Sequence, residues 1–343
     1  MKALWLHLVR AYLRMGLFFY YRRFHTVNKE AVPKTGPLVI LSNHNNALMD
    51  ALLIATRAGR FSYFLTRASV FTNPRIKSFL MSLNMLPVYR VRDGWSTIQN
   101  NNEIFEYCRE LLHKGKVVAL FPEGNHNIRR TVRPLSKGFT RIIFETLETY
   151  PETNLKIIPI GLNYEQADAF ADSVSMVIGN PLNATDFISD NRNQDILNLK
   201  EAVSDNLEVL TTHIPADNYD KDLETLEKLQ VNFLYPSAVN NCIASNYKDC
   251  SFKLHYKPKV LKSVFKALMC IVLFVPYAIW VWFVKPRINE IEFVSTFRFA
   301  ISVTLVPIWI LFVVIVLNTF FVASVGLGYI LLTLLFSLLA VKL

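Results

Sequence analysis

Short apolar runs alternate with amphipathic stretches over the first half of the chain. Apolar or β-branched runs occur at 37–42, 61–66, 84–89, 116–121, 155–163 and 173–179. Between them, apolar residues recur at helical spacing and predict helices at about 45–57, 73–82, 96–114 and 136–150. This alternation is typical of an α/β layer fold, so we predict a mixed, largely parallel sheet flanked by helices.

The pattern changes after residue 182. Residues 183–235 are rich in Asn and Asp and predict loops with two surface helices, at roughly 192–213 and 219–232. We therefore divide the chain into four parts by residue range. These are a helical segment at 1–30, an α/β domain at 31–182, a helical and loop extension at 183–258, and a hydrophobic region at 259–343.

Two long apolar runs dominate the C-terminal region. Phe299 to Val341 contains 43 residues without a charge, roughly twice the length of one membrane span, so it should fold back once. We expect the turn at Asn318-Thr319 or near 326–328. A pair of buried core helices is the weaker alternative, since soluble cores do not need so long an uncharged run.

The second run, Ala267 to Val284, has 18 residues and sits at the lower limit for a span. Pro276 in its middle would either kink a spanning helix or mark a re-entrant one. Three crossings would place Lys285 and Arg287 on the far side of the membrane, against the usual bias of basic residues, whereas a re-entrant segment keeps them cytosolic. We predict three hydrophobic segments and leave the number of crossings open.

The N-terminus has no uncharged core of the kind that signal peptides have, because basic residues interrupt Met1 to Phe24. His7, Arg10 and Arg14 form one stripe at helical spacing, and apolar residues fill the rest. This predicts an amphipathic helix that lies in the headgroup region of a membrane. The alternative is a helix packed on the protein's own core, and both can hold at different positions along it.

The formal net charge is +10, and lysines gather just before the apolar run Ala267 to Val284. They are Lys253, Lys257, Lys259, Lys262 and Lys266. This favours a cytoplasmic membrane boundary and contact with anionic lipid. Because no nucleic-acid motif accompanies the charge, we expect no nucleic-acid partner. The four cysteines lack metal-site spacing, so we expect reduced structural thiols in a cytosol-facing protein.

One histidine and one aspartate stand out at the end of the first predicted strand. Asn43-His44 follows the apolar run 37–42, and Asp50 comes six positions after His44. Histidine can take a proton near neutral pH, and a nearby carboxylate can hold its ring in one tautomer. If a helix begins at about residue 45, contact between the two side chains is feasible. The alternative is that they only cap that helix.

Two other strand ends carry polar residues. Arg90 and Arg92 follow the run 84–89, where an arginine can either bind a phosphate through two hydrogen bonds or face solvent. Glu123-Gly124 follows an apolar strand and a proline; glycine lets a ligand approach closely, and the glutamate can accept from a substrate hydroxyl or hold an arginine. We expect nearby His126 to be a surface residue.

A basic set follows at Arg129, Arg130, Arg133, Lys137 and Arg141. If Ser136 caps a helix, Lys137 and Arg141 lie on one face of it. They would then meet the phosphates of a nucleotide-bearing donor or an acidic carrier protein. A solvated charged face is the equally weighted alternative.

Four motifs in order resemble the glycerophospholipid acyltransferase superfamily over roughly residues 20–180. They are Asn43-His44 with Asp50, the segment ending in Arg90, Phe121-Pro122-Glu123-Gly124, and the proline-containing strand 157–164. The resemblance implies transfer of a fatty acyl group from acyl-CoA or an acyl carrier protein to glycerol 3-phosphate or its 1-acyl form. It places the enzyme at the cytosolic face of a bacterial inner membrane or the endoplasmic reticulum, among membrane lipids.

The resemblance also implies roles for individual residues. His44 would be the general base and Asp50 its orienting carboxylate, with no metal and no cofactor. The substrate-binding set would be Arg90, Arg92, Glu123, Gly124 and Asn43. Donor binding would fall to Arg133, Lys137 and Arg141.

The sequence departs from the family pattern at three points, and the last two concern the acceptor more than the chemistry. Five residues separate His44 from Asp50 instead of the commoner four, which resembles a subgroup acting on glycerol 3-phosphate or dihydroxyacetone phosphate. Asn84 stands where Gly is usual, and Asn125-His126 replaces Thr-Arg. Two other functions stay open: a non-catalytic lipid-binding membrane protein on this scaffold, and a thioesterase that uses His44 with water.

Overall fold

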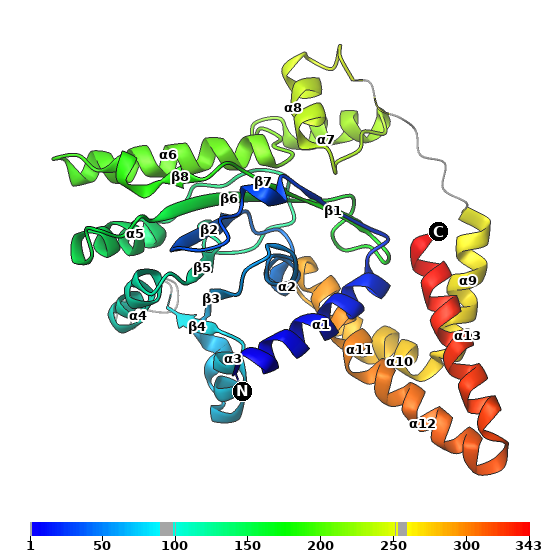
Figure 1. Cartoon of the computed structure of the whole chain (residues 1–343). Coiled ribbons are helices and arrows are strands. Elements are labelled where there is room, and N and C mark those ends of the chain that lie inside the picture. The colour runs from blue at the N-terminus through cyan, green and yellow to red at the C-terminus, as the bar shows by residue number, and fades with distance from the viewer. Residues whose placement is uncertain (1, 90–98, 100, 251, 253–258) are drawn as a thin grey trace.

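The computed structural model describes residues 2–89, 99, 101–250, 252 and 259–343. Its centre is an eight-stranded mixed sheet in the order β1-β7-β6-β2-β5-β3-β4, with β8 beside β6 (Figure 1). The strands are β1 (Arg23–Val27), β2 (Leu38–Ser42), β3 (Ser62–Arg67), β4 (Met85–Val88), β5 (Val117–Leu120), β6 (Lys156–Tyr164), β7 (Ser173–Ile178) and β8 (Leu182–Asn183). Among the described strands, only the pairs β6–β7 and β6–β8 are antiparallel, so the predicted mixed, largely parallel sheet is confirmed.

Helices cover both faces of the sheet because its central strands are apolar on both sides. On β2, Leu38 and Ile40 pack with one hydrophobic cluster, and Val39 and Leu41 pack with the other. The first cluster includes residues of α1 (Lys2–Tyr20) and α2 (Ala47–Arg57). The second includes residues of α4 (Asn101–His113), α5 (Gly138–Thr149) and α6 (Arg192–Leu210).

Helix α1 uses two opposite faces. Leu17 and Tyr20 are buried against the core. On the opposite face, large apolar side chains are exposed: Leu4, Trp5, Leu8, Tyr12, Met15 and Phe18. Packing on the protein's own core is therefore confirmed at Leu17 and Tyr20, and contact of the exposed face with a membrane stays a prediction. The helix ends at Tyr20, and the residues that follow form strand β1, which the sequence did not predict.

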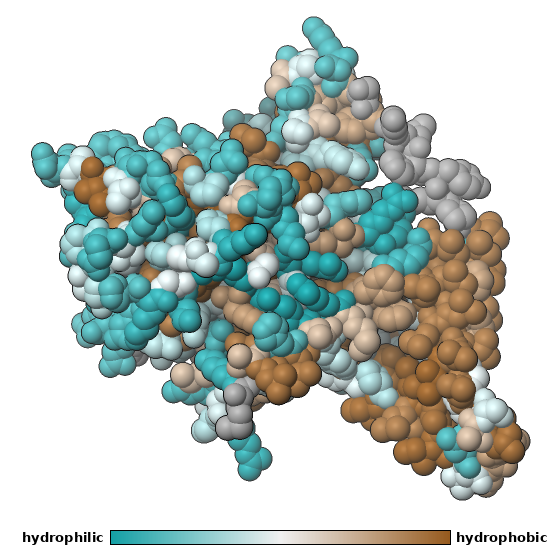
Figure 2. Space-filling view, in the orientation of Figure 1, coloured by the Kyte–Doolittle hydropathy of each residue, from teal (hydrophilic) through white to brown (hydrophobic). Residues whose placement is uncertain are grey.

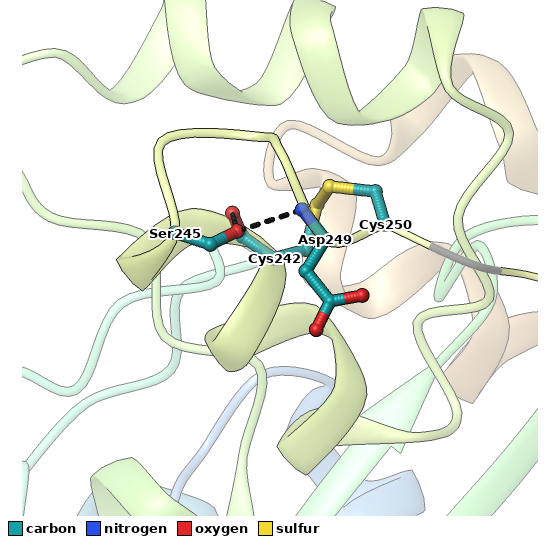
Figure 3. The surroundings of a disulfide bond; sticks show 4 residues. All are labelled: Cys242, Ser245, Asp249 and Cys250. Carbon is teal, nitrogen blue, oxygen red and sulfur yellow. Dashed lines mark hydrogen bonds between the residues drawn. A yellow bond between two sulfur atoms is a disulfide. The ribbon is translucent and has the colours of Figure 1, made fainter.

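The extension folds as a small unit with its own core, from α7 (Tyr219–Lys228) and α8 (Pro236–Ala244). Here one prediction was wrong: Cys242 and Cys250 form a disulfide and are not reduced thiols (Figure 3). The chain reverses after α8, where the Asp249 N–H donates to the Ser245 hydroxyl, and this brings the two Cα atoms to 4.9 Å. Spacing alone does not reveal such a turn. Cys108 and Cys270 are free.

The C-terminal region contains α9 (Lys259–Val272), α10 (Phe274–Ala278), α11 (Val294–Val303), α12 (Leu305–Phe320) and α13 (Ala323–Lys342). Figure 2 shows hydrophobic side chains gathered over these helices. Residues 291–320 and 323–342 are each long and apolar enough to cross a membrane. The chain turns back between them, just after the expected Asn318-Thr319, whereas 326–328 lies inside α13.

The remaining apolar segment is sharply bent. Helices α9 and α10 meet at an angle of 101° across Leu273. They form a third membrane span only if the bent pair is counted as a single span. Pro276 lacks the N–H that would bond the Val272 carbonyl one turn earlier. That carbonyl accepts hydrogen bonds from Trp309 (3.1 Å) and Tyr329 (2.8 Å) instead, which stabilises the break.

Candidate active site

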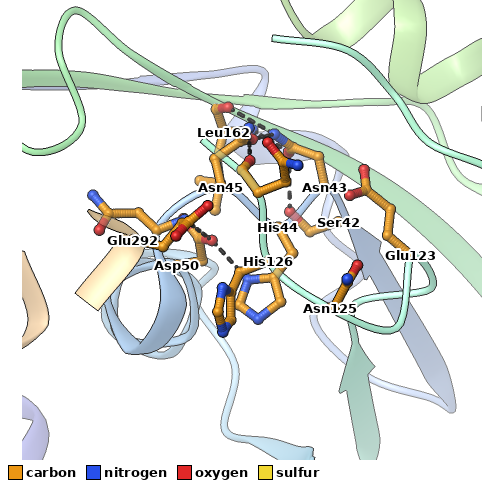
Figure 4. Close-up of polar contacts among 12 residues, drawn as sticks. Ser42, Asn43, His44, Asn45, Asp50, Glu123, Asn125, His126, Leu162 and Glu292 are labelled. Atoms are coloured by element: carbon orange, nitrogen blue, oxygen red, sulfur yellow. Dashed lines mark hydrogen bonds and ion pairs between the residues drawn. The ribbon is translucent and has the colours of Figure 1, made fainter. Parts of the chain in front are cut away.

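The site forms where three adjacent parallel strands end. Strand β2 lies between β5 and β6, and all three run in the same direction, so their carboxyl ends meet at one edge. His44 follows β2, Glu123 follows β5, and Tyr164 ends β6. The polar residues that were separate in sequence therefore converge, as Figure 4 shows for His44, Asp50 and Glu123.

His44 and Asp50 are in direct contact. The His44 Nδ1 lies 2.8 Å from Asp50 Oδ2, and the Asp50 side chain is fully buried. A carboxylate at that position holds the proton on Nδ1 and leaves the lone pair on Nε2. The expected contact is present, and its geometry suits a base that takes a proton through Nε2.

Asp50 has two further partners. Its Oδ2 also accepts the Asn46 N–H (2.7 Å), so the carboxylate caps the start of α2 as well as orienting His44. Its Oδ1 accepts the Tyr164 hydroxyl at 2.5 Å. Burial is the main cause that raises the pKa of Tyr164 well above its ordinary value, so this phenol stays a donor. Sequence analysis missed Tyr164; its place at the end of a strand beside β2 was the available signal.

The asparagines around His44 form hydrogen bonds with neighbouring segments. The Asn43 amide bonds both the N–H and the carbonyl of Leu162, at 2.8 and 2.9 Å. Asn45 donates to the carbonyl of Asn127, and Asn46 to that of Ala167. Asn43, expected among the substrate-binding residues, is buried, and its side chain joins β2 to β6.

The five residues between His44 and Asp50 include an uncommon backbone conformation. Ala47 opens α2 with a φ of 38°, in the left-handed region that L-residues with a side chain adopt rarely. Such a residue persists only where its surroundings hold it in place. Here Asn46, whose side-chain amide donates to the Ala167 carbonyl, precedes Ala47, and the buried Asp50 follows it.

Glu123 holds an arginine. Its side chain is almost wholly buried and forms an ion pair with Arg133, which also donates to the Asn125 side chain. Burial raises the pKa of Glu123, and the nearby Arg133 guanidinium opposes that rise. Gly124 has a φ of 76°, which explains glycine at this turn. Arg133, expected to bind the donor, therefore lies beside Glu123.

His126 belongs to the site and is not an isolated surface residue. Its ring meets that of His44 edge-on, with centroids 5.6 Å apart, and His44 stacks on Phe121 at 4.0 Å. The other side of His126 contacts Phe293 at 4.8 Å. Burial and then the nearby His44 lower the pKa of His126, while the acidic Glu290 opposes this shift.

The first residues of α11, and the short segment before that helix, contribute hydrogen bonds to the loops around this site. Glu292 Oε1 accepts the Ile128 N–H at 3.2 Å. The Ser295 hydroxyl donates to the Ala167 carbonyl, and Arg298 donates to that of Asp168. The C-terminal region thus supports both the loop that carries His126 and the loop after β6, an arrangement the sequence did not indicate.

Among the described residues, one group has the composition of a cation site. The ligand atoms of His126, Glu290 and Glu292 lie within 4.8 Å of one another. Glu290 is 60% exposed, and exposed carboxylates of this kind are common without an ion. The expectation that the chemistry needs no metal stays a prediction.

The other expected site residues are less closely connected. Arg141 donates to Glu145 and Asn102, and Lys137 is exposed at the start of α5. Arg90 and Arg92 lie outside the described residues. The strand before them, β4, is at the sheet edge, three places from β2.

An apolar groove of about 620 Å³ lies beside the site. It is bordered by α1, α2, β3 and β4, and its lining includes Leu13, Leu48, Leu52 and Met85. Leu48 is four positions after His44 and belongs to the same helix as Asp50. The groove therefore leads from the start of α2 toward α1.

Comparison with known proteins gives consistent matches. Residues 23–163 match the family model described as Acyltransferase. An uncharacterized acyltransferase of Schizosaccharomyces pombe is 28% identical over 48% of this chain and 26% of its own length. Glycerol-3-phosphate O-acyltransferase 1 of Saccharomyces cerevisiae is 27% identical over 23% of this chain and 10% of its own. The matches thus span only about a quarter and a tenth of these two relatives.

A bacterial relative is covered more fully. The 1-acyl-sn-glycerol-3-phosphate acyltransferase of Borreliella burgdorferi is 23% identical over 64% of this chain and 79% of its own length. Among solved structures, the 1-acyl-sn-glycerophosphate acyltransferase PlsC of Thermotoga maritima aligns with a TM-score of 0.44 and 16% identity. That alignment covers 60% of this chain and 80% of the solved one.

Proposed function

Because the chain belongs to the glycerophospholipid acyltransferase superfamily, we propose that it transfers a fatty acyl group from an acyl thioester to a hydroxyl of a glycerol phosphate. The donor is acyl-CoA or an acyl carrier protein, and the acceptor is glycerol 3-phosphate or its 1-acyl form. The contact between His44 Nδ1 and the buried Asp50 carries this proposal. It gives the ring a fixed tautomer with a free Nε2.

In the proposed mechanism, His44 Nε2 takes the proton of the acceptor hydroxyl as its oxygen attacks the thioester carbonyl. The tetrahedral intermediate then collapses, the carbon–sulfur bond breaks, and the imidazolium returns its proton to the leaving thiolate. Asp50 stabilises the imidazolium between the two steps. General-base catalysis of this kind supplies roughly 10²–10⁴-fold, and positioning supplies much of the rest.

The apolar groove is suited to a fatty acyl chain. Its lining is almost entirely apolar, and Leu48 places its near end close to the catalytic helix start. Arg90, with Arg92, is proposed to bind the acceptor phosphate. Glu123 and Gly124 would shape the pocket through the fixed Arg133 side chain. Lys137 and Arg141 would contact the donor only through its charged carrier.

We propose that the catalytic domain faces the cytosol and that α9 and α10 form a re-entrant hairpin. The segment that follows them bonds Ile128 and Ala167, so it lies on the side of the catalytic domain. A hairpin that enters and leaves on one side is consistent with that contact and with the 101° bend. It also keeps Lys285 and Arg287 on the cytosolic side, in agreement with the bias of basic residues.

An acceptor panel tests the function. The purified full chain, in nanodiscs, is given one acyl-CoA with glycerol 3-phosphate, dihydroxyacetone phosphate or 1-acylglycerol 3-phosphate, and thiol release and acylated product are measured. We expect stoichiometric thiol and product with at least one acceptor, and loss of both in His44→Ala. Thiol release at a rate that does not change when an acceptor is added would support the alternative function of a thioesterase. No release with any acceptor would support the non-catalytic lipid-binding protein.

A further inference from the structure

Helix α3 (Pro74–Ser82) makes little use of the protein around it. It has nine residues, none of which is buried. Asn73 caps its start by accepting the Arg75 N–H at 2.9 Å, and Pro74 occupies the first helical position. The sequence therefore specifies a helix here, although the fold gives it almost no apolar contact.

Such a helix needs another partner for its apolar side chains. Isolated helices of this length are marginal in water, because helices in proteins are stabilised mainly by packing of an amphipathic face. Ile76 and Phe79 lie three positions apart on one face and are 49% and 53% exposed. Met81 is 46% exposed as well. The described part of the chain leaves these three side chains about half exposed.

Helix α3 adjoins the start of α1, which also exposes apolar side chains. The Trp5 indole N–H donates to the Ser82 hydroxyl at 3.2 Å, which joins the start of α1 to the end of α3. Farther along α1, the Tyr12 hydroxyl donates to the Val303 carbonyl of α11, and Lys342 of α13 donates to the Tyr21 carbonyl. Exposed apolar side chains therefore occur on α3, on the adjoining α1 and on the helices that are able to cross a membrane.

The charges on α3 suit the same partner. Arg75 and Lys77 are exposed, and α3 has no acidic residue. Cationic side chains beside an exposed apolar face favour an anionic lipid surface. The apolar groove ends beside this helix, since Leu83 and Met85, just past α3, are among its lining residues.

We propose that α3 is a second interfacial helix, and that Ile76 and Phe79 insert into the same leaflet on which α1 lies. The partner is a phospholipid bilayer with anionic headgroups. The inserted side chains would lie about 5–10 Å below the headgroup surface. This places the groove mouth at the bilayer surface, where lipid substrates are concentrated. The proposal does not depend on acyl transfer, because it concerns only the contact with lipid.

Fluorescence quenching tests this contact in the full chain. Phe79→Cys is labelled with the environment-sensitive dye NBD in a Cys270→Ser background, since Cys108 is buried and the other two cysteines are bonded. The matched control is Leu197→Cys on α6, which is 54% exposed but belongs to the helix layer on the opposite face of the sheet. Both proteins are placed in vesicles of phosphatidylcholine and phosphatidylglycerol.

We expect a blue-shifted NBD emission at position 79 that falls several-fold with lipids carrying a doxyl quencher near the headgroup end of the acyl chain. The control should show neither effect. Adding Ile76→Asn should weaken quenching at position 79 without changing the circular dichroism spectrum. Equal and unquenched emission at both positions overturns the proposal. A blue shift that grows with protein density but resists lipid quenching also overturns it, because it points to a second protein copy.

Discussion

The Tyr164 hydroxyl gives the sharpest test of the proposed base. It donates to Asp50 Oδ1 at 2.5 Å in a fully buried setting, and Asp50 in turn holds His44. Tyr164→Phe removes only that hydroxyl and keeps the ring. A hydrogen bond to a charged group contributes about 1.5–3 kcal/mol, which corresponds to roughly 10–150-fold in rate if all of it is lost in the transition state.

The assay is the single-turnover rate of acyl transfer, with KM for each substrate measured separately. We expect the rate to fall within that range while both KM values change less than about twofold, because the hydroxyl orients Asp50 and does not touch substrate. Tyr21→Phe is the matched control: Tyr21 is also buried and lies beside Tyr164, but its hydroxyl donates no bond to Asp50.

Two results would refute the reasoning. An unchanged single-turnover rate in folded Tyr164→Phe would show that the hydroxyl does not support the base. An equal loss in Tyr21→Phe would show that removal of either buried hydroxyl slows the reaction, so that the bond to Asp50 has no special part in the rate. Thermal unfolding of both variants separates either outcome from a general loss of structure.

Burial raises the pKa of Asp172 to about 7 from an ordinary value of 3.8, so only the folded state keeps this proton at intermediate pH. Stability should therefore fall as the pH rises from about 4 to about 7, by on the order of 4 kcal/mol. Asp172→Asn should remove this pH dependence of the free energy of unfolding. If the free energies of the wild type and of the variant fall in parallel with pH, the prediction is contradicted. Reduction of the Cys242–Cys250 disulfide should destabilise the extension by roughly 2–3 kcal/mol, seen as a lower Tm that Cys250→Ser reproduces without reductant. Glu292→Ala should slow transfer by roughly tenfold through loss of the Ile128 contact, whereas Glu292→Gln, which keeps an acceptor oxygen, should restore most of the rate. Equal losses in the two Glu292 variants would instead assign the effect to charge.

Residues close together in sequence were the easiest to place. The His44–Asp50 contact lies within a single strand-to-helix turn, so local geometry was enough to predict it. The predicted strands and helices of the sheet also hold to within a few residues, because alternating apolar runs and helical spacing are local signals. The missed strand β1 forms only by pairing with β7, which is about 150 positions away.

Contacts between residues far apart in the sequence could not be predicted from local patterns. Tyr164 reaches Asp50 because β6 lies beside β2, and this neighbour relation is a property of sheet order. His126 was predicted to be a surface residue, but Phe293 from the C-terminal region packs against its ring. Arg133 was expected at the donor because its charge was visible in the sequence, whereas its buried partner Glu123 was not.

The sequence by itself therefore determined the layers, the contact between His44 and Asp50, and the apolar segments suited to a membrane, because each depends on residues a few positions apart. Tertiary structure alone decided what surrounds them. Side chains from β6, from the loop after β5 and from the segment before α11 meet around His44 and Asp50, since burial and strand order join residues that the chain keeps far apart. The same physical reason leaves α3 uncovered: the core that shields its neighbours does not extend to it.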